Sequence, residues 1–281
     1  MKKILVIGSK GNVGRALVEE LAGAGERVRA ATRNPSQSDG APGVEPIRFD
    51  YSDPSTFEPA LEGCDRVFLI GPPDPAPHRV MTPFVEAAVR DRRKLVLMTA
   101  LGSDLDESGS LRQVELALER SGSPFVILRP NWFMDNFHTF WFAPIAEAGV
   151  IPLPAADAKT SLIAAGDIGA AAAATLRTDR YDGRAFTLTG PEALTYAEAA
   201  AVLSKAAGRE IRYVPVDDET FIQSLVEAGV PGDLARYLAD LFVLVREGGA
   251  AVISQDVELL TGRAPTTLTQ YAQKHASAWA K

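Results

Sequence analysis

Three glycines at the joint between the first apolar run and the first helical pattern have the spacing of a phosphate-binding loop. Gly8, Gly11 and Gly14 follow the apolar residues 4–7 directly and open a stretch with helical periodicity. Glycine permits a sharp turn and lets a phosphate approach the backbone, and the following helix directs free N–H groups at that phosphate. We therefore predict a dinucleotide pyrophosphate site formed by Gly8, Ser9, Lys10, Gly11, Asn12, Val13 and Gly14.

The residues about 20 positions further on indicate which dinucleotide is bound. A site that prefers NAD places an acidic residue there, next to the ribose hydroxyls. This chain has Thr32, Arg33 and Asn34 instead, without an acid. Arg33 can pair with a 2′-phosphate, and Lys10 can add a second positive charge, so we predict NADP(H) as the cofactor. Asp50 follows the third predicted strand, where it meets the adenine amino group or, alternatively, caps a helix.

Further candidate residues follow the ends of later predicted strands. Because ligands bind at the carboxyl ends of parallel strands, we expect the turn after residues 67–70 and the end of strand 95–98 to line the cofactor. The predicted contacts there are Ile70, Gly71, Pro72, Thr99 and Pro130. Thr99 and Asn131 are the candidate catalytic residues, and the predicted substrate-binding residues are Asn131, Trp132, Phe133, Asn136 and Phe137. The alternative for these aromatic residues is a purely structural role in joining the C-terminal part to the sheet.

The Tyr–Lys pair of typical short-chain dehydrogenases has no counterpart in this sequence. That pair needs a lysine four residues after the tyrosine, to lower the tyrosine pKa. No lysine occurs between Lys94 and Lys159, where the pair is expected. Each of the six tyrosines is followed four positions later by a residue other than lysine. The pairs are Tyr51 and Ser55, Tyr181 and Ala185, Tyr196 and Ala200, Tyr213 and Asp217, Tyr237 and Leu241, and Tyr271 and His275. We therefore expect a reaction that requires little acid catalysis, such as hydride transfer to a conjugated acceptor.

The elements that must position these residues alternate between short apolar runs and helical patterns. Apolar runs at residues 4–7, 27–32, 44–49, 67–70, 95–98 and 125–128 predict buried strands of a parallel sheet. The later part predicts helices at 132–148, 166–176, 196–207 with Thr195 as N-cap, 230–248 and 268–279, and a strand at 186–188. The predicted fold is α/β, a Rossmann-type doubly wound parallel sheet with a smaller, mostly helical C-terminal substrate domain.

The expected domain boundaries follow from this pattern. Residues 1–130 form the NADP-binding Rossmann domain, with parts of 160–190 contributing to it, and residues 131–281 form an interleaved substrate-binding part.

Several motifs together resemble one family, the NmrA-like atypical short-chain dehydrogenase/reductases. The segment Leu128-Arg129-Pro130-Asn131-Trp132-Phe133-Met134-Asp135-Asn136-Phe137 carries most of the likeness. The glycine loop, Ala31-Thr32-Arg33, Phe49-Asp50, Val67-Phe68-Leu69-Ile70, Ser121-Gly122, Asp167-Ile168-Gly169 and Leu188-Thr189-Gly190 extend it over nearly the whole chain. The sequence is most similar to the branch of NADPH-dependent quinone, azo-dye and triphenylmethane-dye reductases. The resemblance implies an NADP-binding Rossmann domain with a small C-terminal substrate domain, and it leaves the substrate open.

Two classes of function agree with these features. The first is a reductase that transfers hydride from NAD(P)H to a quinone, an azo or cationic dye, or an imine. The second, which the resemblance also implies, is a non-catalytic NADP(H)-binding redox sensor that acts through a protein partner. The aromatic residues after Pro130 favour the reductase, because their rings can stack on a flat acceptor.

Composition, charge and residue spacing argue against membrane, nucleic-acid-binding and metal-binding proteins. The chain has 281 residues, a net charge of −7 and one cysteine, which predicts a soluble cytoplasmic protein without disulfides. No apolar stretch has the length of a leader peptide or membrane span, and the basic cluster Arg90, Arg92, Arg93 and Lys94 is typical of a solvated helix end rather than a nucleic-acid site. His78, His138 and His275 lack metal-ligand spacing. The expected partner is a small aromatic or conjugated acceptor, bound to a monomer or homodimer.

Overall fold

The computed structural model describes residues 3–35 and 42–280, which divide into two compact units. Unit 1 comprises Met1–Pro130, Ala165–Thr187 and Asp256–Gly262, and unit 2 comprises Asn131–Ala164, Leu188–Gln255 and Arg263–Lys281. The chain therefore enters each unit more than once, and each unit is built from segments that are distant in the sequence. Within the described ranges, no helix has the length and apolar character required to cross a membrane.

Unit 1 is organised around a seven-stranded sheet in the order β3-β2-β1-β4-β5-β6-β9. Its strands are β1 Lys3–Ile7, β2 Arg27–Thr32, β3 Val44–Arg48, β4 Arg66–Ile70, β5 Lys94–Met98, β6 Phe125–Pro130 and β9 Arg184–Leu188. Neighbouring strands from β3 to β6 pair in parallel, with Ile4 opposite Val28 on one side of β1 and opposite Arg66 on the other. Both faces of such a sheet are covered, which explains the unbroken apolar runs read in the sequence.

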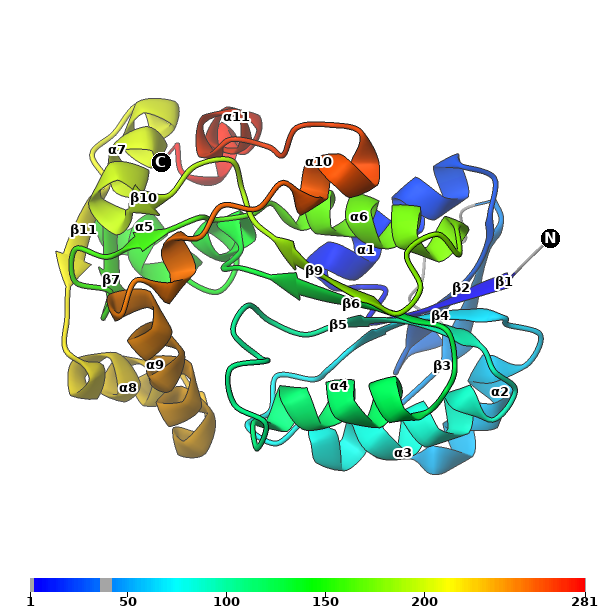
Figure 1. Cartoon of the computed structure of the whole chain (residues 1–281). Coiled ribbons are helices and arrows are strands. Elements are labelled where there is room, and N and C mark those ends of the chain that lie inside the picture. The colour runs from blue at the N-terminus through cyan, green and yellow to red at the C-terminus, as the bar shows by residue number, and fades with distance from the viewer. Residues whose placement is uncertain (1–2, 36–41, 281) are drawn as a thin grey trace. The chain divides into compact units, whose positions relative to one another are not determined.

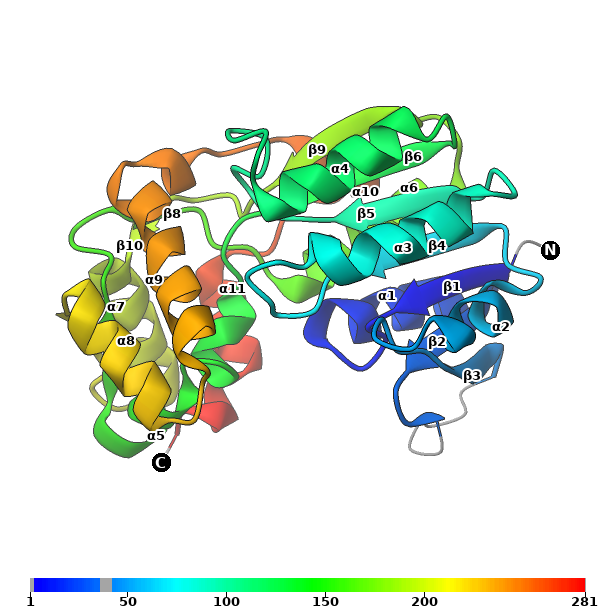
Figure 2. The same cartoon turned by 90° about the horizontal axis from the view of Figure 1, so that it is seen from below.

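Helices cover the two faces of this sheet. They are α1 Asn12–Gly23, α2 Phe57–Leu61, α3 His78–Val89, α4 Ser110–Arg120, α6 Ala165–Arg177 and α10 Asp256–Thr261. Figures 1 and 2 show α2, α3 and α4 on one face and α1 and α6 on the other. The predicted Rossmann-type doubly wound sheet is confirmed by this architecture.

The alanine-rich helix α6 packs very closely on α1, which a glycine makes possible. A Cβ atom on Gly169 would lie 2.9 Å from the Cβ of Ala16 and 2.9 Å from the backbone nitrogen of Leu17. These distances are shorter than any ordinary carbon contact, so the two helices can approach this closely only because position 169 has no side chain. Small residues on α6 thus serve helix–helix contact on one face of the sheet.

Unit 2 is mostly helical and contains two small sheets. Its helices are α5 Phe142–Ala148, α7 Tyr196–Ala207, α8 Asp218–Glu227, α9 Gly232–Arg246 and α11 Leu268–Lys274. In the small sheets, β7 Val150–Leu153 pairs in parallel with β11 Arg212–Pro215, and β8 Lys159–Thr160 pairs antiparallel with β10 Leu194–Thr195. Thr195 caps α7 through a reciprocal capping box with Glu198, which confirms the predicted N-cap.

The predicted helix over residues 132–148 is wrong in its first half. The α-helix begins only at Phe142, after a short 3₁₀ helix at Met134–His138. The reason is a tertiary contact: the backbone N–H of Ile163 donates to the oxygen of Trp132 at 2.9 Å, and the N–H of Met134 donates to the oxygen of Ile163 at 2.8 Å. The first of these bonds uses the Trp132 oxygen, which in a helix would accept from the N–H of residue 136.

Candidate functional site

The predicted cofactor residues of unit 1 all lie at one edge of its sheet, where the strands end. Gly8 to Gly14 follow β1, Arg33 follows β2 and Asp50 follows β3. At the ends of the next strands lie Ile70, Gly71 and Pro72 on β4, Thr99 on β5 and Pro130 on β6. The chain runs outward from β1 in one direction to β2 and β3 and then crosses to β4 on the other side. Such a switch in strand order is where open α/β sheets bind ligands.

The glycine loop has a shape that side chains would prevent. Gly8 adopts the left-handed φ of 73°, and a Cβ there would lie 2.7 Å from the Cγ2 atom of Ile70. A Cβ on Gly14 would lie 2.1 Å from the backbone oxygen of Gly8. The N–H of Gly11 donates to that same oxygen at 2.9 Å and closes the turn. Helix α1 then begins at Asn12 without a side-chain cap, so no side chain occupies the first N–H groups of the helix, the groups that bind anions in phosphate loops.

Two positive side chains flank this loop, and neither has a partner among the residues that the structure describes. The Ser9 hydroxyl donates to the backbone oxygen of Ala31 at 2.8 Å and ties the loop to the end of β2. Lys10, next to Ser9, and Arg33, two residues beyond Ala31, are both exposed. Neither forms an ion pair with any residue in the described ranges. A pair of unneutralised cations beside a phosphate loop suits a ligand that carries an additional phosphate.

The ends of β3 and β4 are joined at this edge by a half-buried tyrosine. The Tyr51 hydroxyl donates to the backbone oxygen of Ile70 at 2.9 Å, and burial raises the pKa of Tyr51 well above its ordinary value. The neighbouring Asp50 accepts a hydrogen bond from the backbone N–H of Ser52 at 2.9 Å through one carboxylate oxygen. Asp50 therefore orders the loop after β3, and the cap of the short 3₁₀ helix that follows is Asp53.

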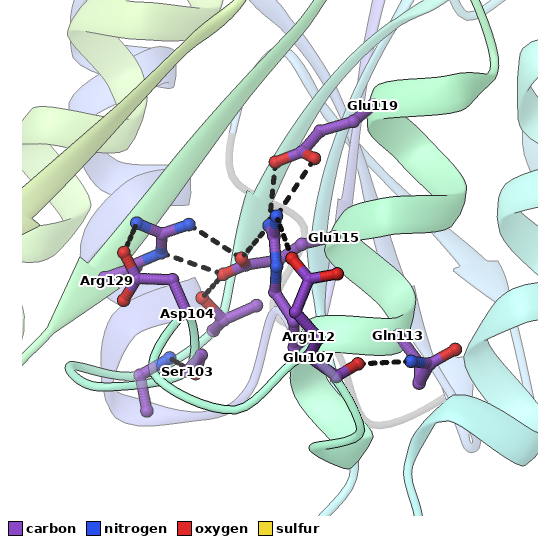
Figure 3. Close-up of polar contacts among 10 residues, drawn as sticks. Ser103, Asp104, Glu107, Arg112, Gln113, Glu115, Glu119 and Arg129 are labelled. Atoms are coloured by element: carbon purple, nitrogen blue, oxygen red, sulfur yellow. Dashed lines mark hydrogen bonds and ion pairs between the residues drawn. The ribbon is translucent and has the colours of Figure 1, made fainter.

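A buried carboxylate joins α4 to the ends of β5 and β6. Glu115 lies between the guanidinium groups of Arg129 and Arg112 (Figure 3) and is wholly buried. Arg129 donates to its oxygens at 3.0 Å from Nε and 2.7 Å from Nη2, and Arg112 donates at 2.9 Å. The Thr99 hydroxyl donates to Glu115 Oε1 at 2.7 Å. Arg129 also pairs with Asp104 at 2.6 Å, in the loop between β5 and α4.

The charge state of Glu115 determines whether the Thr99 hydroxyl can donate a hydrogen bond to a ligand. Burial by itself raises the pKa of Glu115, but the hydrogen bonds from Arg129 and Thr99 and the positive charge of Arg129 outweigh it, so the pKa is lowered. An ionised carboxylate only accepts hydrogen bonds. The Thr99 hydrogen is therefore committed to Glu115, and Thr99 can offer a ligand only a lone pair.

The sequence analysis missed this cluster, although one signal was present. Glu115 lies between Val114 and Leu116 in a helix whose apolar residues are buried. A charged residue on the apolar side of a helix indicates a buried partner, because an unpaired charge there is very costly. Arg129 directly follows the apolar strand residues of β6 and is the corresponding cation. Local periodicity does not reveal that the two residues meet.

In unit 2, the predicted substrate residues divide into buried and accessible groups. The Asn131 side chain donates to Ser161 Oγ and to the backbone oxygen of Ala250, both at 2.8 Å, and accepts from the N–H of Trp132 at 2.9 Å. Both of its donor hydrogens are thus used, which favours a structural role for Asn131. The Phe137 ring is wholly buried in the core of unit 2.

The remaining residues of this segment are more accessible. Trp132 is half-buried, and its ring centroid lies 4.6 Å from that of Phe242 and 5.7 Å from that of Trp141. Phe133 and Asn136 are also half-buried. The amide side chain of Asn136 forms no hydrogen bond with any described residue. Phe133 and Asn136 are therefore the members of the segment whose side chains are least committed to the core.

Comparison with known proteins gives a consistent match. The model of the NmrA-like family matches residues 1–272. The chain is 32% identical to prestalk A differentiation protein A of Dictyostelium discoideum, over 96% of this chain and 91% of that protein. It is 31% identical to an NAD(P)H azoreductase of Xenophilus azovorans, over 98% and 99% of the two chains. The crystal structure of NADPH-dependent quinone oxidoreductase QOR2 from Escherichia coli in complex with NADPH is similar, with a TM-score of 0.81, 28% identity, and coverage of 97% and 99%.

Proposed function

This chain belongs to the NmrA-like family, and on that premise we propose that it is an NADPH-dependent reductase of conjugated electrophiles. The observation that carries the proposal is the uncapped glycine loop with two exposed cations beside it, Lys10 and Arg33, which form no ion pair with the residues that the structure describes. Relatives named as an NAD(P)H azoreductase and a quinone oxidoreductase, each matched over nearly the whole chain, support the same reaction class.

The residues of unit 1 fit a dinucleotide phosphate. The backbone N–H groups at the start of α1 would hold the pyrophosphate, and Arg33 with Lys10 would hold the 2′-phosphate. Asp50 would bind at the adenine, and Gly71, Pro72 and Thr99 would line the remainder of the cofactor. When bound, this cofactor would supply a hydride. Thr99 would offer it a hydrogen-bond acceptor, because Glu115 takes the Thr99 hydrogen.

The acceptor is a molecule that disperses charge over its own π system, such as a quinone, an azo or cationic dye, or an imine. Such acceptors fit a chain in which no lysine hydrogen-bonds a tyrosine hydroxyl among the described residues. In unit 2, Phe133 supplies an apolar surface and Asn136 a free amide for the acceptor. Trp132 and Phe137 pack into the core of unit 2.

The test is a turnover screen with purified protein. NADPH and NADH oxidation are measured against a panel of quinones, azo dyes, triphenylmethane dyes and imines, and the Kd of each dinucleotide is measured by titration. Steady NADPH oxidation with members of this panel is the expected result. Tight NADPH binding without turnover of any acceptor would contradict the reductase and support the redox sensor instead.

A further inference from the structure

The first residues of α3 and α4 form a histidine–serine pair that the preceding sections do not use. His78 Nδ1 lies 2.7 Å from Ser110 Oγ, and both residues are half-buried. The backbone N–H of His78 also approaches Ser110 Oγ, at 3.5 Å. Helix α3 begins after the loop that leaves β4, and α4 begins after the loop that leaves β5. The pair therefore belongs to the two connections that carry Gly71 and Thr99.

Reduction of a quinone at this edge of the sheet requires a proton, which neither Thr99 nor Tyr51 can supply. Addition of one hydride to a quinone gives a hydroquinone anion, which needs one proton on its oxygen. Thr99 cannot supply that proton, because its hydrogen is bonded to Glu115. Tyr51 donates its hydrogen to Ile70, and burial raises its pKa. A histidine is the side chain that exchanges protons most readily near neutral pH.

We propose that His78 and Ser110 form a proton relay to the reduced acceptor, an inference that rests on the proposed function. Ser110 Oγ gives its hydrogen to the acceptor oxygen while it takes the hydrogen from Nδ1 of the His78 imidazole in its Nδ1–H tautomer. Nε2 of the same imidazole, which carries no hydrogen in that tautomer, accepts a proton from water. The hydride brings the two electrons and the relay brings one proton, so the quinone becomes a neutral hydroquinone and one proton is taken from solvent.

The charged groups around the pair are distributed on all neighbouring elements. Asp74 lies in the loop before α3, and Arg79 follows His78. Asp106 and Glu107 precede α4, and Arg112 within α4 is held by Glu115 and Glu119. On α2, Glu58 pairs with Arg90, just beyond the far end of α3. None of these carboxylates forms a hydrogen bond or ion pair with His78 among the described residues, so Ser110 is its direct partner.

The experiment compares two acceptors that differ in their need for a proton. A quinone takes a hydride and a proton, whereas a cationic triphenylmethane dye takes a hydride alone and becomes neutral. We expect Ser110→Ala and His78→Asn to lower kcat for the quinone by about 100-fold, the usual size of a general-acid contribution. The same variants should keep dye turnover and the NADPH Kd within about threefold of wild type, since an acid contributes only where a proton is transferred.

Matched variants separate the relay from a structural role. His78→Asn keeps a polar atom near the Nδ1 position but cannot carry the proton, and Ser110→Thr keeps the hydroxyl and should restore most of the quinone rate. Ser108→Ala, an exposed serine just before α4 that bonds Asp106, should change neither reaction. Melting temperatures identify any variant that fails to fold, and the relay is then judged on the other member of the pair.

Each other outcome overturns the relay. Equal losses with quinone and dye would show a structural role, and an unchanged quinone rate would show that the proton comes from elsewhere. If the wild type reduces the dye but no quinone, the relay is wrong while the reductase stands. If the wild type reduces only the quinone, equal rates for Ser110→Ala and Ser110→Thr overturn it. Wild-type protein that binds NADPH but reduces neither acceptor refutes the proposed function, and the relay with it.

Discussion

The hydroxyl of Thr99 donates to the wholly buried carboxylate of Glu115 at 2.7 Å, and this bond joins the ligand-binding end of β5 to α4. Helix α4 thus supplies a carboxylate whose negative charge two arginines stabilise. The hydrogen of Thr99 is bonded to this carboxylate, so a proton for the acceptor must come from another group.

We expect Glu115→Gln to destabilise the protein by about 3–5 kcal/mol, the usual cost of breaking a buried ion pair. Glu119→Gln is the matched control, because Glu119 also binds Arg112, at 2.8 Å, but is partly exposed. Its loss should cost about 1 kcal/mol or less. Denaturant unfolding at pH 7 measures both, and equal effects would show that burial of the Glu115 pair contributes nothing.

The same pair predicts how stability responds to acid. Because the pKa of Glu115 is lowered below its ordinary value of 4.5, the unfolded chain binds this proton more tightly than the folded protein. The stabilisation is therefore complete above pH 4.5 and is lost as the pH falls through the folded pKa. Wild type should lose its stability advantage over Glu115→Gln across this range in urea unfolding series. A constant difference from pH 6 to pH 3 would contradict the assignment.

Arg33→Ala should weaken NADPH binding about ten- to hundredfold, since a charge-assisted bond to phosphate contributes about 1.5–3 kcal/mol. Binding of NADH should not change, because it has no 2′-phosphate. Arg27→Ala is the control: Arg27 is an exposed arginine at the opposite end of the same strand, β2. Calorimetric titration measures the Kd of both dinucleotides for each variant. An unchanged NADPH Kd in Arg33→Ala would exclude Arg33 as the 2′-phosphate ligand.

Gly14→Ala should abolish dinucleotide binding, because the added Cβ would lie 2.1 Å from the Gly8 oxygen and force the loop open. Gly23→Ala, in the last position of the same helix, meets nothing within 4 Å and should be tolerated. Fluorescence titration with NADPH measures the loss, and circular dichroism monitors the fold. NADPH binding by Gly14→Ala at wild-type affinity would show that the loop is not the phosphate site.

We expect Trp132 and Phe133, in the aromatic segment of unit 2, to contribute differently to stability and to acceptor binding, because Trp132 packs against the core and Phe133 is less committed to it. Trp132→Ala removes ring contacts to Phe242 and Trp141 and should lower the melting temperature, as large core truncations cost about 3–5 kcal/mol. Phe133→Ala should raise KM for the best acceptor with a smaller effect on melting. If both variants lose stability alone and KM stays at the wild-type value, this segment has a structural role only.

The sequence was sufficient where local chemistry determines the structure. Gly8 directly follows β1 and Gly14 lies in the first turn of α1, and the structure shows that the turn between them leaves no room for side chains at either position. The apolar runs likewise predicted β1 to β6 to within a few residues. The sequence was insufficient where distant segments meet. No α-helix forms at residues 132–134, where Ile163 binds the backbone. Glu115 is likewise bound by Arg129, which lies on β6. No periodicity encodes either contact.

The missing side chain at Gly169 also bears on the order in which the protein can form during synthesis. Helix α6 must reach α1 to cover its buried face, yet it emerges from the ribosome only after the first segment of unit 2, Asn131–Ala164, has been made. A nascent chain that ends at Pro130 has strands β1 to β6 but lacks this cover, β9 and α10. Its sheet then exposes apolar surface of the kind that chaperones bind. The interleaved path of the chain thus makes completion of the nucleotide-binding unit a late event.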